Sequence, residues 1–314
     1  MKPVILMAPR LPQRLVSRLE ERYALLGPLE RSAADALPPG AEGARALITI
    51  GSYATDAALI GAMRSLGLVL CYGTGFEGVD LGAARARDIA VTNAGTANAE
   101  AVAEFAMGLV LASTRKVAEG DRFIREGRWG GNAIERLPLV PGLMGRRMGI
   151  YGLGAIGQRI ATRAAAFGME IGYHNRRMAE GVPHAYHATL ESLARWSDVL
   201  VVAVRAAAEN RHAVNAEILA ALGPQGHVVN ISRGSVVDTG ALCDALERKG
   251  IAGAALDVFE NEPEVPERLR AIGTAVLTPH IAAYSESAQF AQQQLVLDNL
   301  EAFFAGRPLS STVV

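Results

Sequence analysis

A run of glycines in the middle of the chain limits its fold more than any other feature of the sequence. Residues 152–157 follow a G-x-G-x-x-G pattern, Gly152-Leu153-Gly154-Ala155-Ile156-Gly157, between an apolar stretch at 147–151 and a segment of helix formers at 158–167. In a strand-to-helix turn, the first glycine permits a tight bend, the second lets a pyrophosphate approach the backbone, and the third lets the helix pack on the strand. The helix N-terminus then offers N–H groups to the phosphates. The pattern predicts a dinucleotide-binding turn; a glycine-rich turn without a ligand is the alternative.

Strand-like and helix-like segments alternate along the rest of the chain. Short apolar runs predict strands at residues 4–8, 46–50, 68–72, 90–93, 148–151, 170–174, 199–204, 228–232, 253–257 and 275–277. Amphipathic or helix-forming runs predict helices at 13–23, 56–64, 99–114 and 285–305, and the segment 125–146 has the composition of a long loop. This alternation is typical of parallel sheets covered by helices.

The position of the glycine turn predicts how the chain is divided into domains. The turn lies at mid-chain, the helix at 99–114 leads towards it, and the helix at 285–305 returns from the last strand. We therefore expect an outer, substrate-binding domain of residues 1–96 and 285–314, with a cofactor-binding domain of residues 97–284 inserted in it. The expected fold is α/β with two doubly wound parallel sheets, a Rossmann domain inserted in a flavodoxin-like domain, and an active site between them.

The composition excludes several classes of partner. The chain has 31 basic and 32 acidic residues, a balance that argues against binding to nucleic acid or to an anionic membrane surface. No apolar stretch approaches the roughly 20 residues of a membrane span, and the apolar part of residues 1–10 is too short for a signal peptide. The two cysteines, Cys71 and Cys243, lie in apolar or helical contexts and favour reduced thiols in a cytoplasmic protein.

The residues after the second predicted strand of the cofactor domain indicate which dinucleotide is bound. An acidic residue about 20 positions past the glycines usually binds the ribose of NAD, but here the sequence is Asn175-Arg176-Arg177. A guanidinium group matches the geometry of a phosphate. We therefore predict a preference for NADP(H), with NAD(H) still possible, Arg176 on the 2′-phosphate, Arg177 assisting and Asn175 on the ribose. A solvated basic loop is the alternative.

Further motifs place charged or titratable residues just past predicted strands. They are Ser232-Arg233-Gly234, the stretch from Asp257 to Pro263 that includes Glu262, and Thr278-Pro279-His280. Ligands bind at the carboxyl ends of the strands in such sheets, so these side chains are candidates for an active site. Alone, each motif is more often an ordinary loop, and it is their order along the chain that carries the argument.

Together with the glycine turn, these motifs resemble the D-isomer-specific 2-hydroxyacid dehydrogenase family, which includes glyoxylate/hydroxypyruvate reductases. The resemblance implies that Arg233 binds substrate, that Glu262 and His280 form the acid/base pair, and that Asp257 contacts the nicotinamide side of the cofactor. Reduction of a 2-oxo acid needs such residues. Arg233 offers a rigid fork of hydrogen-bond donors to the acid, and His280 supplies a proton to the developing alkoxide. Glu262 would favour the imidazolium form and fix its orientation.

The resemblance extends to other loops. It implies that Val204, Arg205 and Ser232 lie near the cofactor, although Arg205 replaces the usual residue type and solvation is its alternative role. In the outer domain, Thr74 and Gly75 match a loop whose backbone N–H groups hold the substrate carboxylate. Asn98 and Glu104 match a hinge and cleft wall. Tyr284 stands where smaller residues are common and is expected to shape the pocket. Trp129 falls in the loop by which family members tend to dimerise, which implies a homodimer with Trp129 at the interface; a cap on its own core is the alternative role.

The resemblance thus predicts an NADP(H)-dependent reductase that converts small 2-oxo acids, glyoxylate and hydroxypyruvate, to D-2-hydroxy acids. Two alternatives stay open. One is a reductase of larger 2-oxo acids, such as 2-ketogluconate or aromatic 2-oxo acids. The other is a non-catalytic, nucleotide-sensing protein resembling a corepressor, against which the near-neutral chain argues.

Overall fold

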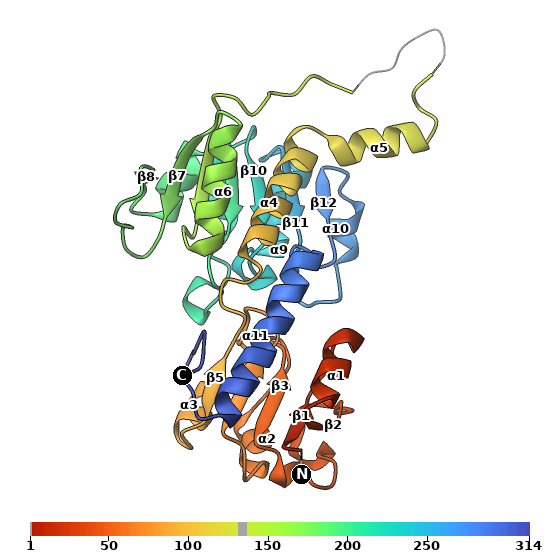
Figure 1. Cartoon of the computed structure of the whole chain (residues 1–314). Coiled ribbons are helices and arrows are strands. Elements are labelled where there is room, and N and C mark those ends of the chain that lie inside the picture. The colour runs from red at the N-terminus through yellow and green to blue at the C-terminus, as the bar shows by residue number, and fades with distance from the viewer. Residues whose placement is uncertain (1, 131–136) are drawn as a thin grey trace. The chain divides into compact units, whose positions relative to one another are not determined.

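The structure is a computed structural model that describes residues 2–130 and 137–314. The chain divides into two compact units, of which unit 1 is Met1–Asn98 with Ser285–Val314 and unit 2 is Ala99–Tyr284. Each unit is built on a parallel sheet with helices between its strands (Figure 1). The predicted α/β class with two parallel sheets is therefore confirmed.

Unit 1 contains a five-stranded sheet in the order β2-β1-β3-β4-β5, in which every pairing is parallel. This is the flavodoxin-like order, which reverses direction between its first and third strands. The strands are β1 (Val4–Met7), β2 (Ala24–Leu26), β3 (Ala46–Thr49), β4 (Leu68–Cys71) and β5 (Ala90–Thr92). The C-terminal residues extend the sheet, because Thr312 forms an antiparallel bridge with Thr92.

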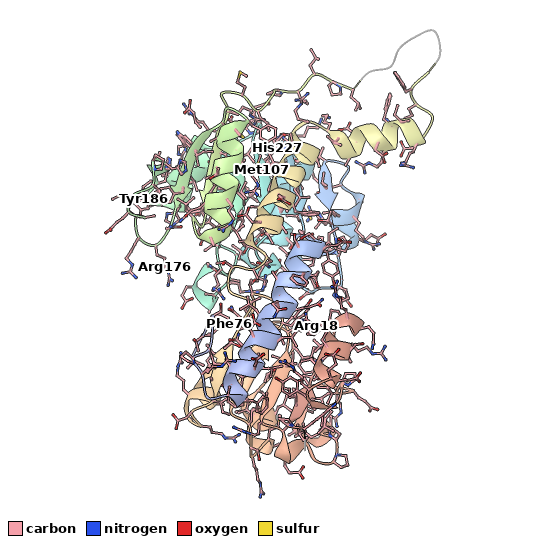
Figure 2. The ribbon with its side chains drawn as sticks, viewed as in Figure 1. Arg18, Phe76, Met107, Arg176, Tyr186 and His227 are labelled. Atoms are coloured by element: carbon pink, nitrogen blue, oxygen red, sulfur yellow. The ribbon has the colours of Figure 1, made fainter. Side chains whose placement is uncertain are left out.

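Helices cover both faces of this sheet. They are α1 (Gln13–Glu20), α2 (Ala57–Ala62), α3 (Leu81–Arg85) and α11 (Glu286–Phe304), with short 3-10 turns η1 (Ala34–Ala36) and η2 (Ala41–Gly43). Leu15 of α1 and Leu300 of α11 belong to one buried cluster, and Leu59 of α2 belongs to the other. Arg18 of α1 also donates to Gln294 of α11 at 3.0 Å (Figure 2). The last helix therefore packs as a part of unit 1, although it is far from α1 in sequence.

Unit 2 contains a seven-stranded parallel sheet in the order β12-β11-β10-β9-β6-β7-β8. The strands are β6 (Arg147–Tyr151), β7 (Glu170–His174), β8 (Ala185–Tyr186), β9 (Val199–Val202), β10 (His227–Asn230), β11 (Gly253–Leu256) and β12 (Ala275–Leu277). Numbered within the unit, this is the Rossmann order 3-2-1-4-5-6 with a seventh strand added. The order reverses between β6 and β9, so the carboxyl ends of these strands form the expected ligand-binding edge.

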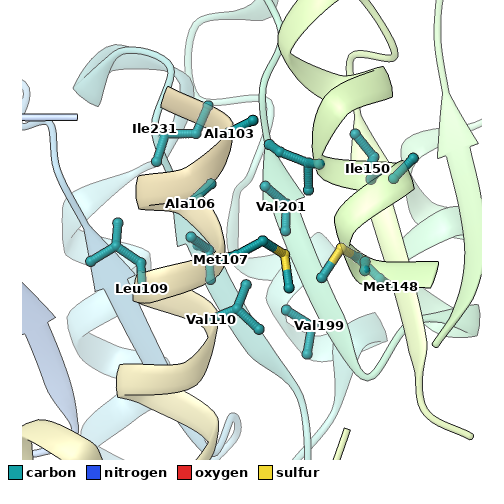
Figure 3. Packing of buried hydrophobic residues seen from close by; sticks show 14 of the residues in the cluster. Ala103, Ala106, Met107, Leu109, Val110, Met148, Ile150, Val199, Val201 and Ile231 are labelled. Atoms are coloured by element: carbon teal, nitrogen blue, oxygen red, sulfur yellow. The ribbon is translucent and has the colours of Figure 1, made fainter. Parts of the chain in front are cut away.

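The faces of the second sheet are covered by two sets of helices. The helices of unit 2 are α4 (Ala99–Thr114), α5 (Val117–Arg125), α6 (Ala155–Ala166), α7 (Leu190–Trp196), α8 (Ala216–Leu222), α9 (Thr239–Glu247) and α10 (Glu267–Ala271), with 3-10 turns η3 (Ala208–Asn210) and η4 (Gly234–Val236). Helix α4 is apolar almost throughout, and its Ala106, Met107 and Val110 pack against Val199 and Val201 of β9 (Figure 3). Helices α7, α8 and α9 cover the opposite face.

Some local predictions differ from the structure. Several strands end one or two residues earlier than predicted, because their last apolar residues already belong to the loops at the sheet edge. Strands β2 and β8 were not predicted, and neither were helices α3, α5, α7, α8, α9 and α10. Residues 126–130 and 137–146 contain no helix or strand, while 131–136 of the predicted long loop lie outside the described residues. None of the described helices has the length and apolar character needed to cross a bilayer.

Candidate active site

The three glycines of the 152–157 turn have different structural reasons to be glycine. Gly152 has a φ of +104°, and a Cβ placed there would lie 2.5 Å from the backbone nitrogen of Val204. A Cβ on Gly157 would overlap the carbonyl oxygen of Gly152. A Cβ on Gly154, in contrast, would meet nothing within 4 Å. Contacts within the fold therefore require glycine at 152 and 157. No such contact requires it at 154, where a ligand that approaches the backbone closely would need the space.

The start of helix α6 is suited to binding an anion. Gly154 is its N-cap and has no side chain to cap the first N–H groups, and the first turn contains no acidic residue. Ala155 and Ile156 form that turn and are only partly buried. Because unpaired N–H groups and the positive end of the helix dipole favour negative charge, this terminus fits the phosphates of a dinucleotide.

The loop that follows β7 carries the residues predicted to bind the ribose and its 2′-phosphate. It lies at the same edge of the sheet as the glycine turn. The side-chain oxygen of Asn175 accepts a hydrogen bond from the backbone N–H of Leu153 at 2.7 Å, which ties this loop to the glycine turn. Arg176 and Arg177 are exposed, and Figure 2 shows Arg176 on the outside of the loop after β7. The sequence analysis placed Asn175 on the ribose; in the structure its oxygen already holds the turn.

The loop after β9 lies against the glycine turn. The backbone of Val204 is the closest neighbour of Gly152. The side chain of Asn210 accepts from the N–H of Ala207 at 2.8 Å and donates to the carbonyl oxygen of Arg205 at 2.7 Å, which closes the loop on itself. The side chain of Arg205 is exposed.

Ser232 follows β10 at the same edge of the sheet. The residue is buried, and its Oγ has no hydrogen-bond partner within the described part of the chain. Buried hydroxyl groups normally have a partner, so this one marks a place where a ligand group is expected. Ser232, the open backbone at Gly154 and the free start of α6 together fit a bound dinucleotide.

Arg233 is held in an extended conformation beside the loop that carries Glu262. Its Nη1 donates to the carbonyl oxygen of Ser232 at 2.8 Å, and Asn230 donates to the carbonyl oxygen of Arg233 at 3.0 Å. A Cβ on the next residue, Gly234, would overlap the backbone of Phe259. Glycine at 234 therefore allows the two loops to meet, and Arg233 lowers the pKa of Glu262 through its charge.

His280 and Glu262 form a hydrogen-bonded pair. His280 Nδ1 and Glu262 Oε2 are 2.7 Å apart, while Glu262 Oε1 accepts from the backbone N–H of Phe259 at 3.0 Å. Partial burial alone would raise the pKa of Glu262, but the hydrogen bonds from His280 and Phe259 outweigh it and the net pKa lies below its ordinary value. Glu262 is therefore a carboxylate at neutral pH and is able to orient the imidazole.

Asp257 fixes the backbone that presents His280. The residue is 1% exposed. Its carboxylate accepts hydrogen bonds from Thr278 Oγ1 at 2.7 Å, Ile281 N at 2.9 Å and Ala282 N at 2.8 Å. His280 has a φ of +54°, which is uncommon for a residue with a side chain. The three hydrogen bonds hold this conformation, so Asp257 acts as a rigid anchor for the residues around His280.

The predicted substrate loop of unit 1 also has a well-defined backbone. Asn93 donates to the carbonyl oxygen of Thr74 at 2.7 Å, and the N–H of Ala94 donates to that of Gly73 at 2.8 Å. A Cβ on Gly51 would lie 2.5 Å from the carbonyl carbon of Gly75, so the two loops touch through their glycines. Sequence analysis did not single out Asn93; a polar residue directly after a buried strand is the feature that points to it.

Other predicted residues have local surroundings that the structure defines. Glu104 of α4 forms an ion pair with Arg163 of α6 at 3.5 Å. Asn98 is buried, and its Oδ1 has no hydrogen-bond partner among the described residues. Tyr284 and Trp129 are exposed to 76% and 66%, respectively. Thr278, which holds Asp257, was not proposed for a positioning role from the sequence.

A comparison with known families identifies the chain. The family described as "D-isomer specific 2-hydroxyacid dehydrogenase, NAD binding domain" matches residues 107–282, which cover β6 to β12. The chain belongs to the D-isomer specific 2-hydroxyacid dehydrogenase family. It is therefore an oxidoreductase, and its matched region is the NAD-binding domain. The recognition made from the ordered motifs is confirmed.

Named relatives of this dehydrogenase extend over nearly its whole length. Glyoxylate/hydroxypyruvate reductase A of Arabidopsis thaliana is 38% identical and covers 99% of this chain and 98% of its own. Hydroxyphenylpyruvate reductase of Plectranthus scutellarioides is 37% identical over the same shares. The structure of an NADPH-dependent glyoxylate/hydroxypyruvate reductase of Sinorhizobium meliloti, in complex with NADP and malonate, is 39% identical and covers 100% of this chain and 97% of its own, with a TM-score of 0.94.

Proposed function

We propose that this dehydrogenase reduces small 2-oxo acids, with glyoxylate and hydroxypyruvate as substrates, to D-2-hydroxy acids at the expense of NADPH. The observation that carries the proposal is the His280–Glu262 pair at 2.7 Å, next to a loop that presents Arg233. Reductases of glyoxylate and hydroxypyruvate among the relatives support the choice of substrate.

The residues of the site have separate tasks in this reaction. Bound NADPH supplies the hydride. Arg233 binds the carboxylate and carbonyl oxygen of the 2-oxo acid through its planar donor fork. Because Nδ1 of His280 is bonded to Glu262, Nε2 is the nitrogen left to deliver a proton, from the imidazolium form, to the oxygen that becomes the alcohol. Glu262 stays ionised and keeps the imidazolium oriented. Thr74 and Gly75 hold the substrate carboxylate through backbone N–H groups.

The proposed cofactor site is the edge of the sheet at β6, β7, β9 and β10. Gly152, Gly154, Ala155, Ile156 and Gly157 cradle the pyrophosphate, and Ser232 offers its buried hydroxyl. Val204 and Arg205 flank the cofactor, and Asp257 lies on its nicotinamide side. In this assignment, residues 97–284 bind NADP(H), while 1–96 and 285–314 bind substrate.

A preference for NADP(H) is proposed because the loop after β7 has two exposed arginines and no carboxylate next to them. The relative from Sinorhizobium meliloti, which is described as NADPH-dependent, supports this preference. Arg176→Ala should raise the KM for NADPH by at least about 10-fold and leave the KM for NADH nearly unchanged, since only NADPH has the 2′-phosphate. An equal effect on both cofactors contradicts the assignment.

A second candidate substrate class is larger 2-oxo acids. The hydroxyphenylpyruvate reductase at 37% identity favours an aromatic acid, and 2-ketogluconate is the sugar-derived alternative. Turnover with glyoxylate, hydroxypyruvate, hydroxyphenylpyruvate and 2-ketogluconate distinguishes these classes by kcat/KM. Tight NADPH binding without turnover of any acid would instead favour the nucleotide-sensing alternative.

We further propose that the protein is a cytoplasmic homodimer. Exposed large apolar side chains gather between residues 117 and 144, namely Val117, Ile124, Trp129, Leu139 and Met144. Both cysteines are buried and free, and burial raises the pKa of Cys71 to about 12, as suits an unreactive thiol in a reducing compartment. Trp129→Asp should convert a dimer to a monomer in analytical ultracentrifugation; a wild-type monomer contradicts the proposal.

A further inference from the structure

A second histidine–glutamate pair lies next to the loop that carries Glu262. Glu260 Oε2 and His212 Nε2 are 2.8 Å apart, and Glu260 Oε1 accepts from the backbone N–H of Thr239 at 3.1 Å. Arg211 adds a longer ion pair with Glu260 at 3.4 Å. The side chain of Glu260 is only 19% exposed, so these contacts are largely shielded from water.

The partners of Glu260 come from two other parts of the edge of the sheet. His212 lies in the loop between β9 and α8, and its backbone N–H donates to Ser235 at 2.8 Å. Thr239 is the first residue of α9. A carboxylate that binds both therefore joins the loop after β11 to the loops after β9 and β10.

The segment around Glu260 sets the position of Glu262. The N–H of Phe259 donates to Glu262 Oε1, and the backbone of Phe259 and Glu260 touches Gly234. Asn261 and Glu264 close the turn through an antiparallel bridge. Glu262 accepts a hydrogen bond from Phe259 and is paired with His280, so its position depends on how firmly residues 259–261 are held.

Charged groups surround Glu260 on several sides. Arg211 and His212 face it from the loop after β9, and Asp238 lies 3.9 Å from His212 on the opposite side of that imidazole. Burial raises the pKa of Glu260, but the hydrogen bonds from His212 and Thr239 outweigh this and leave its pKa below the ordinary value. The group is thus a carboxylate at neutral pH and bonds as an anion.

We propose that Glu260 is a positioning residue for catalysis: by binding Thr239 and His212, it fixes the turn that holds Glu262 against His280. The proposal rests on the proposed function in assigning the acid/base role to that pair. It predicts that loss of Glu260 affects the reacting pair more than the cofactor site, since the polar partners of Glu260 among the described residues are His212, Thr239 and Arg211 and not the glycine turn or Ser232.

The test compares Glu260→Ala and Glu260→Gln with a control, Glu264→Gln, which alters an exposed carboxylate in the same loop. In Glu260→Ala, kcat should fall by about 10- to 100-fold, with the Kd for NADPH within about twofold of wild type. Glu260→Gln keeps an acceptor for Thr239 but loses the charge that binds His212, so it should recover only part of the lost kcat and stay measurably below the wild type. Glu264→Gln should match the wild type.

A pH titration separates positioning from a merely structural role. The alkaline limb of the kcat/KM profile of Glu260→Ala should move to lower pH, because the imidazolium of His280 loses its aligned carboxylate partner. The 15N shifts of the His280 ring should report the same displacement, and they need no turnover. If Glu260→Ala does not fold, the same measurements on Glu260→Gln and His212→Gln take its place.

The possible outcomes are distinct. Wild-type kcat and an unshifted His280 titration in Glu260→Ala, or in the two substitutes, overturn the inference. A lower melting temperature with an unchanged kcat of the folded protein also overturns it, because that result describes a purely structural contact. If the wild type turns over no 2-oxo acid, the proposed function fails, and the ring titration of His280 still decides whether Glu260 positions Glu262.

Discussion

Replacing each glycine of the 152–157 turn by alanine should separate folding from cofactor binding. At Gly152, an alanine faces a φ of +104° and a Cβ only 2.5 Å from Val204 N, and at Gly157 it overlaps a carbonyl oxygen. Overpacking and left-handed strain each cost about 1–3 kcal/mol, so Gly152→Ala, which has both, should lose about 3 kcal/mol or more, and Gly157→Ala, which has only overpacking, should lose about 1–3 kcal/mol. At Gly154, φ is −89° and no atom lies within 4 Å of the new methyl group. Stability there should change by less than about 1 kcal/mol, because the lower entropy of the unfolded alanine chain is opposed by the poorer N-cap that alanine makes.

The affinity for NADPH should follow the reverse order, with Gly154→Ala affected more than its stability suggests. The methyl group of Gly154→Ala occupies the space in which a pyrophosphate approaches the backbone, so the Kd for NADPH should rise by at least about 10-fold, or about 1.4 kcal/mol. Thermal unfolding measures the first effect, and titration of NADPH fluorescence measures the second. A Gly154→Ala variant that binds NADPH like the wild type refutes the phosphate-binding role of this turn. A Gly152→Ala variant of normal stability refutes the steric argument.

Other predictions concern pH and the anchoring of the catalytic loop. Burial, then the charges of Arg146 and Lys116, lower the pKa of His227 from 6.5 to about 4, so the unfolded chain takes up this proton first as the pH falls. Between pH 6.5 and 4 this should remove up to about 3 kcal/mol of stability, and His227→Gln should abolish that part of the acid sensitivity in urea unfolding. Since the pKa of Glu262 lies below 4.5, Glu262 should remain a carboxylate above that pH in the wild type. Glu262→Gln should therefore lower kcat by about 10- to 100-fold at neutral pH, and a wild-type kcat contradicts the role of Glu262 as the partner of His280. Asp257→Ala removes the acceptor of three hydrogen bonds and should lower both kcat and stability, the latter by about 3 kcal/mol in thermal unfolding; an unchanged melting temperature contradicts the anchoring role.

The parts of the fold that follow from local pattern could be predicted from the sequence. The helix at 99–114 and the strand at 170–174 agree with the structure residue for residue, because each is a long or clearly bounded apolar run. Strands β2 and β8 have three and two residues and lie at sheet edges, so neither is long enough to show a period. Helix α5 begins after Lys116 in a left-handed conformation, a break that the apolar pattern does not indicate.

Some residues of the candidate site could likewise be predicted from local sequence pattern, and others could not. Arg233, Glu262 and His280 could be proposed from the sequence because each follows a buried strand in a recognisable motif, and the topology brings those strand ends to one edge. The residues that hold them were not found. Thr278 acts on Asp257, and Asn93 acts on Thr74, through contacts between loops that are distant in sequence. Such contacts depend on side-chain packing and not on the order of residues along the chain.

Steady-state oxidation of NADPH and NADH with glyoxylate and hydroxypyruvate, by the wild type and by His280→Gln, is the most direct test of the proposed function. We expect rapid turnover by the wild type with NADPH, a much lower kcat/KM with NADH, and a loss of at least about 100-fold in kcat in His280→Gln with NADPH binding retained. Equal rates in the wild type and His280→Gln, or no turnover of either acid by the wild type, would contradict the proposed function.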